Sequence, residues 1–255
     1  MRKSLRLLLC PLWLVVFSAP VLAEQPLRAC ADDAQWPPFS YRVGDGPMIG
    51  FTIDLLRHIF QANYPQLQID PLPWKRCLAV TESGEYQIAI DASANPERLK
   101  TFRLSEPYYQ LSPYYFYSKL HFPAGLAIKQ GRDLVKPGPV CGILGYSYSE
   151  FALGDTPIVG NARDFHALVA MLHRGRCASF IARYEIVAGM GLVGTDLLTD
   201  NELGYAPIPD AEPDPFYLLI SRNIPHSESL KREFDQGLAR MRQSGELQRL
   251  RAAYP

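Results

Sequence analysis

The chain has 255 residues with 26 basic and 26 acidic side chains, so its formal net charge is zero. Three of the basic residues (Arg2, Lys3 and Arg6) lie in the first six positions, and no basic run follows them. This pattern argues against nucleic acid and anionic membrane surfaces as partners. The length is sufficient for a full hydrophobic core, in one large domain or in two lobes.

The first 23 residues predict an export signal. Their basic residues precede an apolar run, and Val21-Leu22-Ala23 supplies a cleavage site before Glu24. A membrane anchor is the alternative, but the apolar run is short for a span of ~20 residues and is flanked by prolines at positions 11 and 20. We expect cleavage after Ala23, which leaves a mature chain of 232 residues with a net charge of −3.

Four cysteines remain after this cleavage: Cys30, Cys77, Cys141 and Cys177. An even number in an exported chain favours disulfides. No C-x-x-C pair is present and no histidine stands at metal-ligand spacing beside a cysteine, which argues against a zinc site. The sequence allows three pairings. We favour Cys30–Cys77 and Cys141–Cys177, the second above all because both of its cysteines fall in strands predicted to be neighbours.

The first part of the mature chain alternates strands with helices. Helical spacing of apolar residues marks 51–64, and Gly84 ends a second short helix. Prolines and glycines predict a loop over 34–50. The expected order is strand 26–33, loop 34–50, helix 51–64, strand 67–74, helix 74–84 and strand 86–93. Strand–helix–strand–helix–strand predicts a parallel sheet of an α/β protein.

The middle of the chain repeats this order without repeating the sequence. We expect strand 138–145, helix 146–154, strand 156–161, helix 164–175 capped by Asp164, and strand 177–182. Two extended runs over 203–222 and a charged amphipathic helix over 227–254, broken near Gly245, complete the chain.

Two α/β lobes follow from this repetition. We place 24–118 and 212–255 in lobe 1 and 119–211 in lobe 2, with crossings near 114–120 and 203–210. The carboxyl ends of both sheets then face one cleft, where open α/β sheets bind ligands.

Four segments carry a resemblance to a known family. They are "WPPFSYRVGDGPMIGFTIDLLRHI", "GEYQIAIDASANPERLKTFRLSEPYY", "HRGRCASFIARYE" and "MRQSGELQRLRAAY", in the expected order. The chain resembles the family 3 periplasmic solute-binding proteins, the amino-acid receptors of ABC importers. The resemblance implies a type II, two-lobed Venus flytrap fold and a periplasmic location. It also implies a monomer that binds a small molecule and docks on a membrane permease, without cofactor or metal.

The resemblance also suggests ligand-binding residues in lobe 1. Arg98, in "NPER", matches the arginine that binds the α-carboxylate, since a guanidinium offers two parallel donors to a carboxylate. The alternative is a surface arginine. Ser93 matches an acceptor for the ligand amine, or else caps a turn. Trp36 and Trp74 match aromatics that sandwich the ligand, or else pack in the core. Asp33 matches an acid that reaches the ligand or orders its loop.

In lobe 2 the chain departs from the family pattern. Gly145-Tyr146-Ser147 offers backbone donors for an anion at a helix start. Arg183 stands where these receptors commonly place an aspartate for the α-ammonium, which an arginine would repel. Either Asp33, Asp91 or Glu185 holds the amine, or the ligand is another anion such as a dicarboxylate. Arg183 can also pair with Glu185 or with an acid across the cleft.

Binding without chemistry is the expected function, because the chain has no G-x-S-x-G, H-E-x-x-H or phosphate-binding loop. One alternative is an enzyme on the same fold that resembles cyclohexadienyl dehydratases, with Glu185 or Asp91 as general acid. A second alternative is a receptor that passes ligand binding to a signalling partner.

Overall fold

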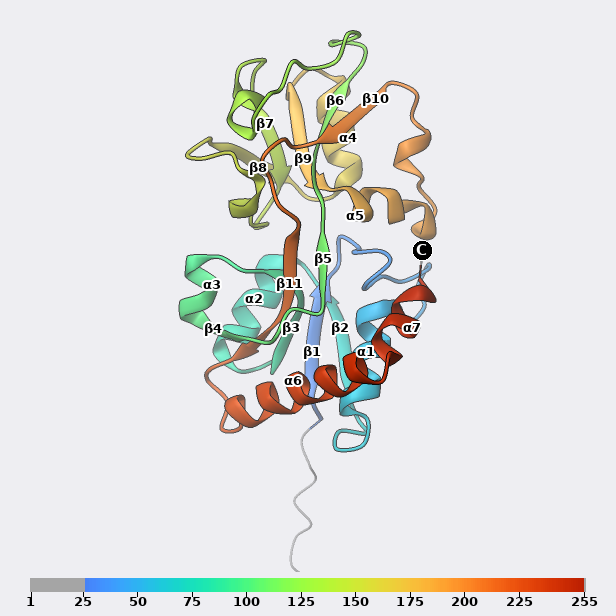
Figure 1. The fold of residues 1–255 in the computed structure, drawn as a ribbon, viewed down its shortest axis with the longest axis vertical. Coiled ribbons are helices and arrows are strands. Elements are labelled where there is room, and N and C mark those ends of the chain that lie inside the picture. Colours follow the sequence, from blue (N-terminus) through green and yellow to red (C-terminus); the bar gives the residue numbers. More distant parts are fainter. Residues whose placement is uncertain (1–25, 255) are drawn as a thin grey trace, which may run out of the picture.

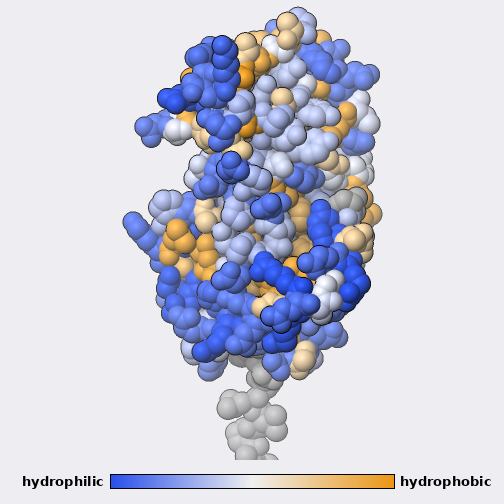
Figure 2. Space-filling model, viewed as in Figure 1, coloured by the Kyte–Doolittle hydropathy of each residue, from blue (hydrophilic) through white to orange (hydrophobic). Residues whose placement is uncertain are grey.

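A computed structural model describes residues 26–254. The expected signal peptide of residues 1–23 lies outside the described residues. The described chain forms two α/β lobes, one above the other in Figure 1, with two extended segments running between them. Figure 2 shows a mostly hydrophilic face that is indented between the lobes at its left edge. Within 26–254, no helix combines the length and the apolar character that crossing a membrane requires.

Lobe 1 is built on the sheet β2-β1-β3-β11-β4, with β5 paired to β11. β1, β2 and β3 are parallel, and β11 runs antiparallel to β3. The strands are β1 (Arg28–Asp32), β2 (Gln68–Leu72), β3 (Ile88–Ser93), β4 (Phe102–Leu104), β5 (Tyr109–Leu111) and β11 (Asp214–Ser221). The helices are α1 (Phe51–Phe60), α2 (Trp74–Ser83), α3 (Pro96–Thr101), α6 (Ser227–Gln243) and α7 (Glu246–Ala252).

Lobe 2 is built on the sheet β10-β6-β9-β7-β8. β7 is parallel to β8 and β9, while β6 runs antiparallel to β9 and β10. The strands are β6 (Pro113–Ser118), β7 (Val140–Ile143), β8 (Ile158–Ala162), β9 (Ser179–Arg183) and β10 (Leu203–Pro207). The α-helices are α4 (Phe165–His173) and α5 (Tyr184–Gly189), and the 3-10 turns are η1 (Gly131–Val135), η2 (Ser149–Phe151), η3 (Met190–Val193) and η4 (Leu197–Thr199).

Local sequence signals explain most of these boundaries. The Asp164 carboxylate accepts a hydrogen bond from the Ala167 amide at 2.8 Å and so caps α4, as expected. Gly84 follows α2 with φ 87°, and Gly245 separates α6 from α7 with φ 70°; both lie in the left-handed region that glycine adopts readily. The helix expected over 146–154 is only the 3-10 turn η2, which ends at Ala152 with φ 53°.

The two lobes share one plan, in which three parallel strands lie beside an antiparallel strand that has just crossed from the other lobe. β11 is that strand in lobe 1 and β6 is that strand in lobe 2. The expectation that lobe 1 extends to residue 118 therefore differs from the structure, because β6 pairs with β9 and Phe116 stacks on Phe180 at 4.7 Å. The chain crosses near Ser112 and again over 208–213.

Two disulfides lie within the lobes. Cys30 in β1 bonds Cys77 in α2, and Cys141 in β7 bonds Cys177 just before β9. These are the two favoured pairings. Each bond fastens an inner strand of its sheet, β1 in lobe 1 and β7 in lobe 2, to a neighbouring segment of the same lobe.

Candidate functional site

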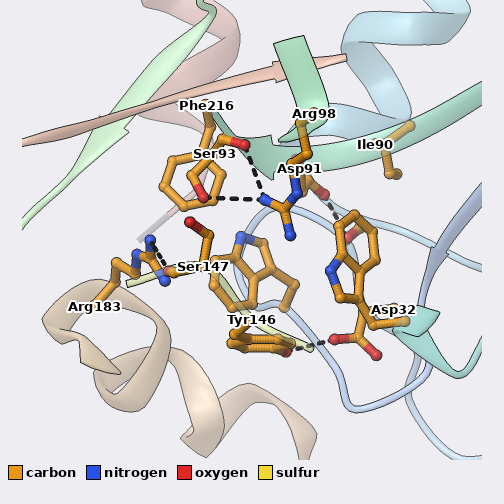
Figure 3. A pocket seen from close by; sticks show the side chains of 12 residues that line it. Asp32, Ile90, Asp91, Ser93, Arg98, Tyr146, Ser147, Arg183 and Phe216 are labelled. Carbon is orange, nitrogen blue, oxygen red and sulfur yellow. Dashed lines mark hydrogen bonds between the residues drawn. The ribbon is translucent and has the colours of Figure 1, made fainter. Parts of the chain in front are cut away.

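The carboxyl ends of β1, β3, β7 and β9 converge on a cavity between the lobes. Side chains of both lobes line this cavity (Figure 3). The lining residues are Asp32, Trp36, Ser40, Trp74, Ile90, Asp91, Ser93, Arg98, Tyr146, Ser147, Arg183 and Phe216. Seven of the eight residues expected at the ligand are therefore in this wall, and the exception is Asp33.

Arg98 reaches into the middle of the cavity from α3 (Figure 3). The Asn95 side chain caps α3 by accepting from the Arg98 amide at 2.7 Å, which fixes where the arginine starts. Arg98 is 5% exposed, and its guanidinium donates through Nη1 to the Ser93 carbonyl at 2.8 Å and to the Ser93 hydroxyl at 3.2 Å. Nη2 lies 3.5 Å from the Gly145 carbonyl of lobe 2, and the group stands 5.3 Å from the Trp74 ring. Ser93 thus holds the arginine.

Arg98 is a buried cation whose hydrogen-bond acceptors are all neutral oxygens. Burial, followed by the nearby charge of Arg183, lowers the pKa of Arg98 to about 10, so it stays protonated at neutral pH. Within residues 26–254, no carboxylate forms an ion pair with it. A buried charge without a counterion is costly. An anion in the cavity would remove this cost.

Arg183, by contrast, has a counterion inside the protein. Its side chain is 3% exposed, and both Nε, at 3.1 Å, and Nη2 donate to one oxygen of Asp214, which is 1% exposed. Nη2 also donates to the Ser147 carbonyl at 3.0 Å, and the guanidinium lies 4.7 Å from the Phe151 ring. The pair joins the end of β9 to the start of β11. The sequence suggested that Arg183 pairs with Glu185, with an acid across the cleft or with an anionic ligand. The structure pairs it with Asp214 of lobe 1, so neither Glu185 nor a ligand is needed to balance its charge.

Asp91 is an acid of the cavity wall whose oxygens are already occupied. Oδ1 accepts from Thr52 at 2.6 Å, Tyr108 at 3.0 Å and Tyr109 at 2.9 Å, and Oδ2 accepts from Ser40 at 2.5 Å. Burial raises the pKa of Asp91, and these four hydroxyl donors oppose the rise. A carboxylate offers about four acceptor positions, so little capacity remains for a ligand amine.

Asp32 is a second acid of the cavity wall, and unlike Asp91 it can accept further hydrogen bonds. Oδ2 accepts from the Tyr146 hydroxyl at 2.5 Å, and Oδ1 accepts from the Ala34 amide at 3.1 Å. About two of its four acceptor positions therefore have no donor among the described residues, and Asp32 lines both the cavity and the outer groove. Burial raises the pKa of Asp32 to about 6, although both hydrogen bonds lower it. Its carboxylate is ionised at neutral pH and lies in the same cavity as Arg98.

The other two acids considered from sequence lie elsewhere. Asp33 is exposed and lines an outer groove next to the cavity. Glu185 does not line the cavity: its carboxylate accepts from the Ser112 amide at 3.0 and 3.1 Å and from the Ser112 hydroxyl at 2.7 Å. Because Ser112 is the crossing residue between β5 and β6, Glu185 anchors α5 to a hinge segment.

Aromatic rings form the rest of the wall. The Trp36 indole donates to the Tyr109 hydroxyl at 2.9 Å, and its ring lies 5.6 Å from Phe216 and 5.5 Å from Tyr146. Trp74 lies beneath the Arg98 guanidinium. Phe216 and Asp32 were missed from sequence. In the sequence Phe216 is one of several apolar residues of a strand that returns to lobe 1. Its position near the start of β11, just after the chain crosses between the lobes, could have indicated that it lies at the cavity.

Comparison with known proteins places the chain in a family. The model of the "Bacterial extracellular solute-binding proteins, family 3" matches residues 28–254. The chain belongs to this family. A probable histidine-binding protein of Neisseria gonorrhoeae is 20% identical to this family 3 chain over 246 residues, which cover 93% of this chain and 86% of that protein.

Two solved structures show the type II periplasmic binding protein fold of the chain. One is an amino acid ABC transporter substrate-binding protein of Streptococcus pneumoniae bound to L-arginine, with 23% identity, a TM-score of 0.68, and 88% of this chain and 92% of that chain covered. The other is an ancestral amino-acid-binding protein described as a precursor of cyclohexadienyl dehydratase, with 21% identity, a TM-score of 0.69, and 90% and 95% covered. At these identities the likeness concerns the fold.

Proposed function

We propose that this family 3 protein binds an α-amino acid in the cavity and places its carboxylate on Arg98. The observation that carries the proposal is that Arg98 is a buried cation with only neutral acceptors, whereas Arg183 is balanced by Asp214. A ligand carboxylate would receive two charge-assisted hydrogen bonds from Arg98 and supply its missing counterion.

The ammonium group of the ligand belongs at Asp32. Asp32 has open acceptor positions, while the oxygens of Asp91 are filled by four hydroxyl groups. A zwitterionic ligand therefore matches Arg98, a cation without a counterion, and Asp32, an anion with free acceptor positions. A dicarboxylate would bring a second negative charge beside Asp32, with Arg183 already paired, so the charges of the wall favour an amino acid over the anionic metabolite considered from sequence.

The proposal includes the setting in which the protein acts. After cleavage behind Ala23, the mature chain would bind its ligand in the periplasm as a monomer and deliver it to the permease of an ABC importer. The similarity to a probable histidine-binding protein and to an amino acid ABC transporter substrate-binding protein supports this setting. Two chain crossings between the lobes support opening and closing about a hinge.

An enzyme on this fold is the second candidate, and one observation favours it. Asp32 is a buried cavity acid whose pKa is raised to about 6, a property of general acids. Asp91 and Glu185, the acids suggested from sequence, are occupied by hydroxyl and amide donors. A hydrogen-bonded chain of Ser118, His173 and Asp200 in lobe 2 resembles a nucleophilic triad, but the Ser118 hydroxyl is buried and lines neither the cavity nor the outer groove.

A thermal-shift screen of Glu24–Pro255 against amino acids and organic acids tests the binding function. A ligand at 100 times its Kd stabilises the folded protein by about 2.7 kcal/mol. We expect at least one amino acid to raise the melting temperature. If neither class produces a shift, the small-acid proposal is wrong. Turnover of prephenate by the wild-type protein would instead favour the enzyme.

Arg98→Ala tests the carboxylate anchor. Loss of two charge-assisted hydrogen bonds should weaken binding by roughly 100-fold or more, measured by calorimetry. The melting temperature without ligand should not fall, because the variant also removes an unbalanced buried charge. Arg57→Ala, which removes an exposed arginine paired with Asp54, is the matched control and should leave affinity unchanged. An Arg98→Ala affinity equal to that of the wild type would contradict the assignment.

A further inference from the structure

The cavity adjoins a much larger groove between the lobes. The two share Asp32 and Trp74 in their walls. With adjoining solvent included, the empty space is about 330 Å³ at the cavity and about 1760 Å³ at the groove. The groove carries charges of both signs, including Asp33, Arg42 and Lys75 from lobe 1. A ligand side chain longer than the cavity would have to leave it between the shared residues and enter this groove.

Tyr146 stands at this boundary. Its side chain lines the cavity but not the groove, and its hydroxyl bonds the shared residue Asp32 across the lobes at 2.5 Å. The Tyr146 and Trp36 rings pack in a T-shaped arrangement, with ring centroids 5.5 Å apart and an interplanar angle of 77°. Figure 3 shows Tyr146 and Asp32 linked along one side of the cavity, opposite the end where Arg98 is held by Ser93. The ring therefore fills the space next to the exit.

The backbone beneath the ring has little freedom to move aside. Gly145 has φ 82°, and a Cβ placed on it would lie 3.0 Å from Cγ of Lys75 and 3.6 Å from Cδ1 of Trp74. The loop is thus packed directly on lobe 1. The Tyr146 amide donates to the Ile143 carbonyl at 3.2 Å, which ties the turn to the end of β7.

We propose that Tyr146 determines specificity by size: it closes the cavity to the groove and selects amino acids with short side chains. This inference rests on the proposed function, because it needs the ligand's carboxylate on Arg98 and its ammonium on Asp32. Between these two groups the α-carbon lies in the cavity, and a side chain the size of glycine, alanine or serine stays within it. The longer side chains of arginine and lysine meet the Tyr146 ring.

Calorimetry on the mature chain tests the inference with glycine, alanine, serine, arginine and lysine. The wild type should bind at least one short amino acid with a Kd at least tenfold lower than that for arginine or lysine. Tyr146→Ala should reduce this ratio at least tenfold, because its cavity opens into the groove. Tyr146→Phe keeps the ring and loses only the hydroxyl, so it should bind more weakly but keep the preference for short side chains.

The outcomes separate the two proposals. If the wild type binds arginine as tightly as the short amino acids, size selection is wrong, while the proposed amino acid function is unaffected. An unchanged ratio in a folded Tyr146→Ala variant would do the same. If none of the natural amino acids binds the wild type, the proposed function itself is wrong, and size selection with it. The wild-type ratio decides the inference even if the alanine variant does not fold.

Discussion

The ion pair of Arg183 and Asp214 offers a direct test of the charge balance described above. Asp214→Asn removes the negative charge while keeping the shape of the side chain. Oδ1 of Asp214 has no hydrogen-bond partner in the part of the chain that the structure describes, so the new amide group gains no acceptor there. The variant leaves Arg183 buried with the Ser147 carbonyl and an uncharged amide oxygen as partners.

The expected cost follows from this burial. Breaking a buried ion pair from one side costs about 3–5 kcal/mol, because the remaining charge is left in a medium of low polarity. For a chain of this size each kcal/mol lowers the melting temperature by about 2–4 °C, which gives a decrease of roughly 6–20 °C. Glu246→Gln is a matched control, since it removes the acid of an exposed pair with His58 and should cost less than about 1 kcal/mol.

Thermal and urea denaturation without ligand measure both variants. The double variant Arg183→Met, Asp214→Leu removes both charges and should recover most of the stability lost by Asp214→Asn. A loss below about 1 kcal/mol for Asp214→Asn would refute the reasoning, because it would mean that Arg183 does not depend on this carboxylate. Arg183 would then again be a cation available to a ligand.

Two further predictions concern binding. The pKa of Asp32 is raised to about 6 in the free protein, so below pH 6 its carboxyl group takes up a proton that an ammonium ligand must displace. Ligand affinity should therefore fall about tenfold between pH 7 and pH 5. Asp32→Asn should bind weakly at both pH values, without this pH dependence. A pH profile equally steep in the variant would exclude Asp32 as its source. Gly189 in lobe 2 has φ −70°, which alanine also adopts, but a Cβ there would lie 2.6 Å from the Pro37 carbonyl oxygen of lobe 1. Gly189→Ala should therefore hinder closure of the lobes and weaken ligand binding about tenfold. Its melting temperature without ligand should stay unchanged. Gly191→Ala, whose Cβ would meet Asp196 at an ordinary 3.6 Å, should bind normally, and equal affinity of both variants would show that this lobe contact is absent from the bound state.

The alternation of strands and helices was predictable because each signal is local. Apolar spacing marked α1, an aspartate marked the start of α4, and glycine marked the break at Gly245. The lobe boundary was not predictable from such signals. Residues 113–118 read equally well as a strand of either sheet, and their pairing with β9, more than 60 residues away, decides the assignment.

The candidate site shows the same limit at the level of single residues. Arg98 was predictable from "NPER" after a buried strand, because the motif and its strand are adjacent in sequence. The choice between Asp32 and Asp33 was not, since neighbouring residues at a strand end point in opposite directions and one position decides which faces the cavity. The Arg183–Asp214 pair and the Tyr146–Asp32 hydrogen bond join residues 31 and 114 positions apart, and only the folded topology brings them together.

These contacts give the two lobes different tasks. Arg98 and Asp32, the cavity's unbalanced cation and the acid with open positions, both belong to lobe 1, so in the proposed function this lobe holds both charged groups of an amino acid before closure. Arg183 of lobe 2 is neutralised by Asp214, at the start of the lobe 1 strand β11, and lobe 2 contributes Tyr146, whose hydroxyl donates to Asp32. In the proposed function Asp32 therefore contacts both the ligand and Tyr146 of lobe 2. Because a ligand shifts a conformational equilibrium only through its different affinity for the two states, a carboxylate shared by ligand and lobe 2 supplies such a difference.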